Sequence, residues 1–392
     1  MKICFCVSRL LERSQTFVTT QILHAVRAGH DVTVACREVA PSNLNAADQA
    51  DIDKVRIMHW PPAPPPLVQH LPASVADKIT AQINRRTWRR EIEADVVIAH
   101  FGNQGALIAR AQSGWADRPP LITIYHGRDV SVEYARDRMA RYRQLLAEGD
   151  LHLPVNRSFA ELLVKAGAPA DRVETLHLGV PVERYPFTPK PVRQPLHLTS
   201  VCRLVQKKGL DVAIEALALL HAQHPEIDWR YDIGGDGPLA GALRSQVARH
   251  GLTDRIRFLG ALSHDETLQQ IAAADALLAP SVTAEDGDQE GIPVTLMEAM
   301  ALGTVVVTSR HSGIPELVED GVSGYLADER DVEGVKNILA TLGRSHVPGM
   351  AQRARACVER SFDDRSQSDA LLRFASEMVR EPARLRQASS CG

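Results

Sequence analysis

The chain has 392 residues, of which 24% are charged, and a formal net charge of −3. This length exceeds what one hydrophobic core usually supports and predicts two domains of ordinary size. A charge so close to balance gives no global signal for nucleic-acid binding. The six cysteines show neither CxxC pairs nor the density of a disulfide framework, which favours reduced thiols.

Hydropathy argues against export and against membrane spanning. The apolar run 3–7 is too short for the core of a signal peptide. No apolar run approaches the roughly 20 residues that cross a bilayer. We therefore expect a cytoplasmic protein, soluble or peripherally attached at the inner membrane.

Strand and helix patterns alternate in the first half of the chain, as is typical of a parallel sheet covered by helices. The order begins with a buried strand, an amphipathic helix and a second strand. Two more strands are expected before residue 130. These elements are predicted at 3–7, 16–27, 31–36, 96–99 and 121–125.

The same pattern restarts after the proline-rich stretch 181–195. Ser263 and Glu266 have capping-box spacing before a helix, and Gly303 and Gly313 stand where helix ends and tight turns need glycine. The predicted strands are 196–201, 229–233, 275–279 and 305–308, with a helix at 209–221.

These patterns predict an α/β protein with two Rossmann-like, doubly wound domains that face each other across an interdomain cleft. The first domain is expected to comprise residues 1–185. The second is expected to comprise residues 192–361 and to bind the ligand.

Glu290 and Glu298 bracket the most informative segment. Pro293 is well placed to open a helix, so the backbone N–H groups of Val294 and Thr295 would form a positive helix end that binds phosphate. Carboxylates repel phosphate, so the two glutamates are better explained as partners for neutral hydroxyls. Together these features predict a nucleotide-sugar pocket.

Arg203 and Lys208 follow the first strand of the second domain. Two cations at the carboxyl end of a strand could neutralise a diphosphate. A pair of solvated surface cations is the alternative.

Two glycine turns are further candidates for ligand contact. The stretch 234–237 resembles half of a dinucleotide fingerprint, but Ala240 replaces its last glycine. A close backbone turn at Gly235 is therefore favoured over NAD binding. The loop with Gly260 and Leu262 could read a base edge with backbone groups, although many α/β loops look similar.

Asp286 and Asp288 form a D-x-D pair that could hold a divalent ion on a diphosphate. A calcium loop starting at Asp286 would need a glutamate at its twelfth position, where Met297 stands. An acidic cluster is also typical of a solvated loop, and Arg203 and Lys208 could already supply the charge that a metal would bring. We therefore expect no metal, and we expect no cofactor beyond the sugar nucleotide itself.

Histidines follow two strands of the first domain. His126 comes after the strand 121–125 and is followed by glycine, so it could point into the cleft, although half of such histidines are structural. His100 has the same position after 96–99 and is a candidate for the acceptor side.

The segment 84–90 places four arginines around Trp88. A basic helix with an aromatic anchor can rest on an anionic membrane surface. A solvated helix face explains the same pattern.

On these residues the chain resembles retaining glycosyltransferases of family 4 (GT4), which have the two-domain GT-B fold, and among them bacterial exopolysaccharide enzymes of the colanic acid and amylovoran type. The resemblance spans nearly the whole chain. It is carried by the stretches 14–17, 99–102, 126–131, 204–209, 280–300 and 311–316.

The resemblance implies that a C-terminal helix, 362–392, packs back on the first domain, and it implies a role for each matching position. Glu298 would hold the ribose hydroxyls, Glu290 the transferred sugar, and His126 would face that sugar near the reacting carbon. Backbone groups of Gly291, Ile292, Pro293, Val294 and Thr295 would line the sugar and phosphates, and Arg203 and Lys208 would hold the diphosphate.

The chain departs from the family pattern at the first loop. Residues 8–14 contain no glycine, so a phosphate contact there is in doubt. Ser14 and Gln15 are expected on the acceptor side, but relatives usually have glutamate where Gln15 stands, so a charged role is lost.

The predicted activity is transfer of a hexose, with retention, from a nucleotide-diphosphate sugar to a lipid-linked oligosaccharide in exopolysaccharide biosynthesis. The resemblance favours a UDP-hexose. Two alternatives stay open, which are a GDP-mannose-dependent mannosyltransferase and a catalytically silent protein that binds nucleotide sugars. An NAD-dependent oxidoreductase is a weaker one.

Overall fold

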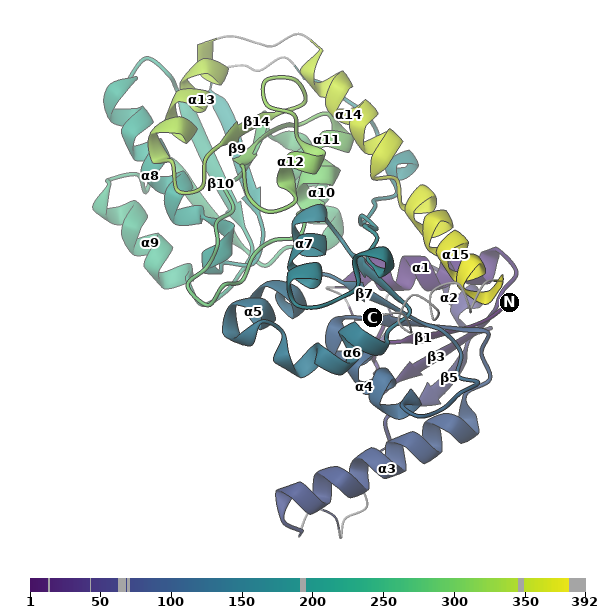
Figure 1. Ribbon diagram of the computed structural model, residues 1–392. Coiled ribbons are helices and arrows are strands. Elements are labelled where there is room, and N and C mark those ends of the chain that lie inside the picture. Colours follow the sequence, from purple (N-terminus) through teal and green to yellow (C-terminus); the bar gives the residue numbers. More distant parts are fainter. Residues whose placement is uncertain are drawn as a thin grey trace. The chain divides into compact units, whose positions relative to one another are not determined.

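The computed structural model describes residues 1–12, 15–42, 44–62, 68, 71–190, 195–344 and 349–380. The chain divides into two compact units (Figure 1), of which one comprises Met1–His177 with Arg365–Gly392 and the other Leu178–Asp364. The expected site residue Ser14 and residues 381–392 of the expected C-terminal helix lie outside the described residues.

The first unit is built on a six-stranded parallel sheet in the order β5-β3-β1-β6-β7-β8. Its strands are β1 (Lys2–Cys6), β3 (Asp31–Cys36), β5 (Arg56–His59), β6 (Val96–His100), β7 (Leu121–Tyr125) and β8 (Leu151–Pro154), and β2 (Arg9–Leu10) pairs separately with β4 (Glu38–Val39). Its helices are α1 (Thr16–Arg27), α2 (Ala46–Ile52), α3 (Ala73–Glu91), α4 (Gly102–Gln112), α5 (Arg128–Asp137), α6 (Arg143–Glu148), α7 (Arg157–Lys165) and α15 (Asp364–Arg380).

Helix α15 joins this unit from Arg365 onward although the rest of its sequence neighbourhood belongs to the other. The carboxylate of Asp369 lies 2.7 Å from Nε2 of His24 on α1. The last described helix thus packs beside the first one, over a sequence separation that local patterns cannot reveal.

The second unit repeats the topology with the order β11-β10-β9-β12-β13-β14, again all parallel. Its strands are β9 (Leu196–Val201), β10 (Trp229–Gly234), β11 (Ile256–Gly260), β12 (Ala276–Ala279), β13 (Val305–Ser309) and β14 (Tyr325–Ala327). Its helices are α8 (Leu210–Gln223), α9 (Ala240–Arg249), α10 (His264–Ala273), α11 (Val294–Leu302), α12 (Ile314–Leu317), α13 (Val332–Arg344) and α14 (Met350–Ser361).

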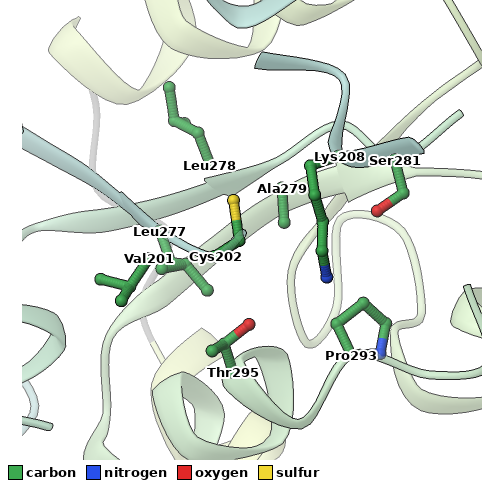
Figure 2. A pocket seen from close by; sticks show the side chains of 9 residues that line it. All are labelled: Val201, Cys202, Lys208, Leu277, Leu278, Ala279, Ser281, Pro293 and Thr295. Atoms are coloured by element: carbon green, nitrogen blue, oxygen red, sulfur yellow. The ribbon is translucent and has the colours of Figure 1, made fainter. Parts of the chain in front are cut away.

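Each sheet has one point where the strand order reverses, between β1 and β6 in the first unit and between β9 and β12 in the second. Doubly wound sheets bind ligands outside the carboxyl ends of the strands at this point. Figure 2 shows the residues that gather there in the second unit. The predicted fold class, two doubly wound parallel-sheet domains, is confirmed.

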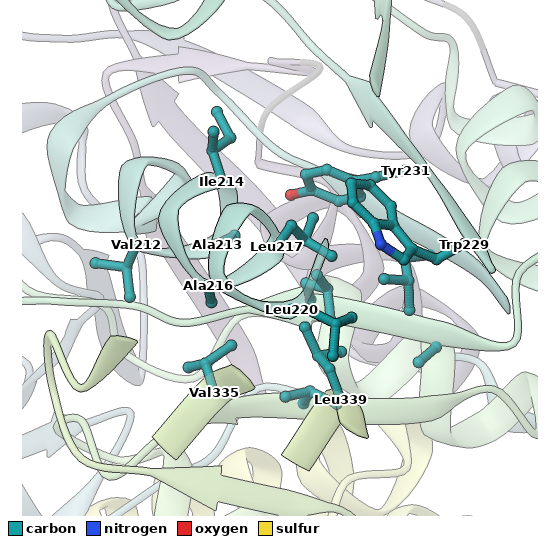
Figure 3. Close-up of a cluster of buried hydrophobic side chains, with 14 of the residues drawn as sticks. Val212, Ala213, Ile214, Ala216, Leu217, Leu220, Trp229, Tyr231, Val335 and Leu339 are labelled. Atoms are coloured by element: carbon teal, nitrogen blue, oxygen red, sulfur yellow. The ribbon is translucent and has the colours of Figure 1, made fainter. Parts of the chain in front are cut away.

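A cluster of buried hydrophobic side chains packs helices of the second unit against its sheet (Figure 3). Leu217 and Leu220 of α8 are fully buried in one cluster with Trp229 of β10 and Leu339 of α13. Burying each such side chain contributes about 1.5–3 kcal/mol relative to leaving it exposed. This cluster therefore stabilises the strands whose ends carry the predicted site residues.

Several local predictions are confirmed and two need correction. Ser263 and Glu266 form the capping box of α10, and Gly303 ends α11 with a left-handed φ of 92°. Pro293 occupies the N-cap of α11 rather than its first helical position. Gly313 has a φ of −82°, so its turn does not require glycine.

The interpretation of Trp88 as a membrane anchor is wrong. Its side chain is fully buried, and its ring packs 4.7 Å from that of Trp60. The flanking Arg85 and Arg86 are exposed, whereas Arg89 donates to the carbonyl of Ser113. Among the described helices, none combines the length and apolar character needed to cross a membrane.

Candidate functional site

A small pocket opens at the reversal point of the second sheet (Figure 2). Val201 and Cys202 contribute from the end of β9, and 277–279 from β12. The opposite wall comes from Pro293 and Thr295, at the start of α11, where the first helical N–H groups lack intrahelical acceptors. The side chain of Lys208 extends between these walls. A cation and a positive helix end therefore line the same pocket, an arrangement that favours anion binding.

Two glycines allow the backbone to close around this pocket. Gly209 has a φ of 62°, and a Cβ placed on it would lie 1.9 Å from the carbonyl oxygen of Pro280. Gly235 has a φ of 126°, and its Cβ would lie 1.8 Å from the carbonyl oxygen of Cys202. No other residue fits at either position. The turn that follows Lys208 is thus pressed against the end of β12.

Glu290 and Lys208, both predicted site residues, form a buried ion pair with 2.9 Å between Lys208 Nζ and Glu290 Oε1. A second cation, Lys207, lies 3.5 Å from the same oxygen. Burial opposes the charge of Glu290, but the two lysines outweigh it and lower the pKa of this carboxyl group. Burial likewise opposes the charge of Lys208, but Glu290 outweighs it and raises the lysine pKa. Both groups are therefore charged at neutral pH.

Lys207 also contacts the acidic loop that carries Asp286 and Asp288. Its Nζ lies 3.1 Å from Asp288 Oδ1 and 3.3 Å from the carbonyl oxygen of Gln289. The backbone N–H of Asp288 donates to Asp286 Oδ1 at 3.0 Å. Both carboxylates thus contribute to the structure of their own loop.

Glu298 lies on α11 with only 3% of its surface exposed. The hydroxyl of Tyr185 donates to Glu298 Oε1 at 3.4 Å, and Nδ1 of His264 lies 3.8 Å from the same oxygen. Burial raises the pKa of Glu298. Such a carboxylate can accept from a ligand hydroxyl while Tyr185 holds its orientation.

Of the remaining residues predicted to bind the donor sugar nucleotide, Pro293 and Thr295 line the pocket, and the others lie at the carboxyl ends of strands or near the start of α11. Arg203 is exposed and forms no ion pair with the described carboxylates. The N–H of Gly235 donates to the carbonyl of Gly260 at 2.6 Å, which ties the ends of β10 and β11 together. Leu262 packs over Gly234, where an added Cβ would lie 2.6 Å from Leu262 Cδ1. Gly291, Ile292 and Pro293 are buried, and Val294 and Thr295 are partly buried.

A different kind of cluster lies at the reversal point of the first sheet. His100 ends β6, His126 follows β7, and 3.2 Å separates His100 Nδ1 from His126 Nε2. The His126 ring lies 4.6 Å from the ring of Phe17 and 4.4 Å from that of Phe101. Burial lowers the pKa of His100 to about 3 and that of His126 well below its ordinary value. Two neutral imidazoles therefore share one hydrogen bond in an aromatic surrounding.

Asp129 holds the two loops that carry these histidines. Its Oδ1 accepts from the N–H groups of His126 at 3.1 Å and Gly127 at 2.9 Å, and its Oδ2 accepts from Gly102 N–H at 2.8 Å. Burial raises the pKa of Asp129. The turns after β6 and β7 are joined through one carboxylate.

Gln15 and His100, the other predicted site residues of the first unit, lie in different surroundings. Gln15 directly precedes α1, whose second residue, Phe17, contacts the His126 ring. His100 is fully buried beneath this contact. Because His100 has no exposed surface, its contact is with His126 inside the protein.

Sequence reasoning missed Lys207, Asp129 and Tyr185. Lys207 adjoins Lys208, and Asp129 stands in the predicted motif, so both carried a local signal. Tyr185 carried none, because 113 residues separate it from Glu298.

Comparison with known proteins agrees with the geometry of both units. A family model described as Glycosyltransferase Family 4 matches residues 14–184, and one described as Glycosyl transferases group 1 matches residues 195–344. The structure resembles that of HepE from Anabaena, solved in complex with UDP-glucose, with a TM-score of 0.71, 21% identity, and coverage of 96% of this chain and 100% of that one.

Curated relatives extend over almost the entire chain. The amylovoran biosynthesis glycosyltransferase AmsK of Erwinia amylovora is 33% identical, over 93% of this chain and 96% of its own length. The putative colanic acid biosynthesis glycosyltransferase WcaL of Escherichia coli is also 33% identical, with the same two coverages. At this identity and coverage, the chain belongs to glycosyltransferase family 4.

Proposed function

We propose that this glycosyltransferase moves a hexose, with retention of configuration, from a UDP-sugar to a lipid-linked oligosaccharide in exopolysaccharide biosynthesis. The observation that carries the proposal is the Lys208–Glu290 ion pair at the N-terminal end of α11. It combines a cation and helix N–H groups for a diphosphate with a carboxylate for sugar hydroxyls. The roles of AmsK and WcaL support the pathway, and the ligand of HepE supports UDP-glucose as a model donor.

In this proposal the second unit binds the donor. Glu298 accepts hydrogen bonds from the ribose hydroxyls, and Glu290 accepts from the hydroxyls of the sugar. Lys208 exchanges part of its contact with Glu290 for the diphosphate, and the exposed Arg203 supplies a second cation. The loops with Gly235, Gly260 and Leu262 line the nucleoside.

The reaction breaks the bond between the anomeric carbon and the diphosphate oxygen and forms a bond from that carbon to the acceptor oxygen. The acceptor proton passes to the leaving diphosphate on the same face, so no protein base is needed opposite the glutamates. Lys208, Arg203 and the helix end stabilise the charge that develops on the diphosphate. His126 contacts the transferred sugar, and His100 supports His126 from beneath.

No metal step belongs to this proposal, because protein cations serve the diphosphate. Transfer is therefore expected to continue in EDTA. Strict dependence on added Mg²⁺ or Mn²⁺ would contradict this part of the proposal and return attention to Asp286 and Asp288.

A thermal-shift screen followed by a product assay tests the main proposal. Bound ligand stabilises the folded protein in proportion to the logarithm of its concentration over Kd. UDP-glucose and UDP-galactose are expected to raise the Tm more than GDP-mannose, and transfer to a lipid-linked acceptor should follow. A larger shift with GDP-mannose would favour a mannosyltransferase, and binding without any product would favour a silent sensor.

We further propose peripheral contact with the inner membrane face through the exposed Arg85 and Arg86 of α3. Vesicles with anionic lipid should retain the protein, and charge reversal at these two positions should release it. Equal sedimentation of both proteins with the vesicles would refute this contact.

A further inference from the structure

His311 lies fully buried after β13 and connects the backbone of Glu290 to Glu329. Its Nε2 lies 3.0 Å from the Glu290 backbone nitrogen, and its Nδ1 lies 2.6 Å from Glu329 Oε1. Together these two contacts bring the loops after β12, β13 and β14 to one ring.

The partners determine the protonation of this ring. A backbone N–H can only donate, so Nε2 of His311 must be the acceptor. Burial opposes the charge of Glu329, but the N–H of Thr283 and the His311 ring outweigh it and lower the pKa of this carboxyl group. An ionised carboxylate only accepts, so Nδ1 of His311 must donate. The ring is therefore neutral with its proton on Nδ1.

Glu329 is in turn held in place. Its Oε2 accepts from the backbone N–H of Thr283 at 2.8 Å, and its Oε1 lies 3.4 Å from the Thr283 hydroxyl. The chain of contacts runs from the loop after β12, through Glu329 and His311, to the N–H of Glu290. Each link connects segments separated by at least 18 residues.

We propose that His311, oriented by Glu329, is a positioning residue that holds the backbone of Glu290 at the donor sugar. This inference rests on the proposed function. The side chain of Glu290 has its own partners, Lys208 and Lys207. With its backbone fixed by His311, the carboxylate can exchange a lysine contact for sugar hydroxyls without displacement of the loop.

The consequence for catalysis is selective. Loss of the His311 contact frees the loop at Glu290, while Glu298, Arg203 and Lys208 still hold the nucleotide. A shift of about 1 Å in a reacting group can cost about 100-fold in rate. The inference therefore predicts a lower kcat with little change in the KM for the donor, which a general loss of fold would not produce.

Three substitutions of His311 differ in which of its two ring nitrogens their side chains can replace, and so they separate the contact to Glu290 from the contact to Glu329. His311→Gln can place an amide oxygen near the position of Nε2 and so restore an acceptor for Glu290. His311→Asn reaches only the position of Nδ1 and keeps the contact to Glu329. His311→Leu has neither polar atom but a comparable volume. Glu329→Ala, at a partly exposed position, loosens the ring while leaving the core untouched.

Amide hydrogen exchange at Glu290, measured on the full chain without ligand, tests the contact directly. Exchange should be faster in His311→Leu and His311→Asn than in the wild type, slower again in His311→Gln, and moderately faster in Glu329→Ala. Equal exchange at this amide in the Leu and Gln variants would overturn the proposal. This measurement holds even if no sugar transfer is detected, so failure of the proposed function remains distinguishable.

Steady-state kinetics with UDP-glucose as the donor probe completes the test. His311→Leu is expected to lower kcat by about 30- to 100-fold with the donor KM within about 3-fold of the wild type, and His311→Gln should recover most of the loss. A rise in KM with unchanged kcat, or equal losses in both variants, would contradict the positioning role.

Discussion

The two units place different chemistry at the same position of the same topology. In the second, the reversal point of the sheet carries buried charges, with Lys208 and Lys207 around Glu290. In the first, it carries two neutral histidines among aromatic rings. A shared fold thus determines where a site forms, while side-chain charge determines what it can bind. The charged site suits a diphosphate, and the neutral one suits an uncharged sugar.

Substitution of Glu290 should have the largest effect on this contrast. Glu290→Gln keeps the shape of the side chain but removes the charge that Lys208 and Lys207 stabilise, and we expect kcat to fall by about 100- to 1,000-fold. The measurement is initial transfer rate, with circular dichroism as a check on folding. Glu285→Gln, an exposed position in the same loop, is the matched control. Near-normal turnover of Glu290→Gln would remove Glu290 from the site.

Substitution of Lys208 should separate binding from chemistry. Lys208→Met removes the buried cation of the pocket, and a charge-assisted contact of this kind contributes about 1.5–3 kcal/mol, so UDP should bind about 10- to 100-fold more weakly. Calorimetry with UDP measures this change. Lys165→Met on α7, where the side chain is 58% exposed, should leave UDP affinity unaltered. Unchanged UDP affinity in Lys208→Met would contradict the diphosphate role.

Substitution of His126 should have the opposite profile. His126→Ala removes the ring that packs on Phe17 and Phe101, and we expect kcat to fall about 10- to 100-fold while UDP affinity changes by less than about 2-fold. The reason is that the neutral cluster offers nothing to a diphosphate. A loss of UDP affinity as large as that in Lys208→Met would contradict the assignment of diphosphate binding to the second site alone.

The two units should also differ in how much stability they lose as the pH falls. Burial holds the pKa of His100 at about 3 and lowers that of His152, a fully buried residue on β8, to about 4, whereas an unfolded histidine has its ordinary value near 6.5. Below pH 6.5 the unfolded state binds more protons than the folded state at these two histidines. The folded state is therefore favoured fully above pH 6.5, and its stability falls as the pH is lowered. At pH 5 the loss is roughly 2 kcal/mol for each histidine.

Glu290 behaves differently because its folded pKa is lowered. Its contribution is present above the ordinary carboxyl pKa and is lost only as the pH falls through the lowered value. Hydrogen exchange at pH 7.5 and pH 5 should therefore show greater loss of protection in the first sheet than around Glu290. His100→Phe should lessen the pH dependence of the first sheet, and an equal dependence in both proteins would contradict the assignment.

Much of the fold was predictable because its signals are local. The strands β3, β7 and β9 match the predicted ranges, because each is a short segment rich in apolar and β-branched residues that follows a glycine or proline signal. The capping box at Ser263 and the helix end at Gly303 depend on neighbouring residues alone. Trp88 was misinterpreted because its surrounding arginines are local, while its partner Trp60 is 28 residues away in sequence.

The amino-acid sequence by itself determined the two doubly wound units and the identities of Glu290, Glu298, Lys208 and His126 as candidates, because spacing and strand ends carry that information. Only the tertiary structure decided their partners. The ion pair of Glu290, the hydroxyl of Tyr185 on Glu298, and the ring of His311 behind the Glu290 backbone all join segments that are distant in sequence. The contacts of Glu290 arise because loops that follow β9, β12 and β13 meet at one edge of the sheet, whereas Tyr185 reaches Glu298 across 113 residues, and no local pattern encodes either kind of contact.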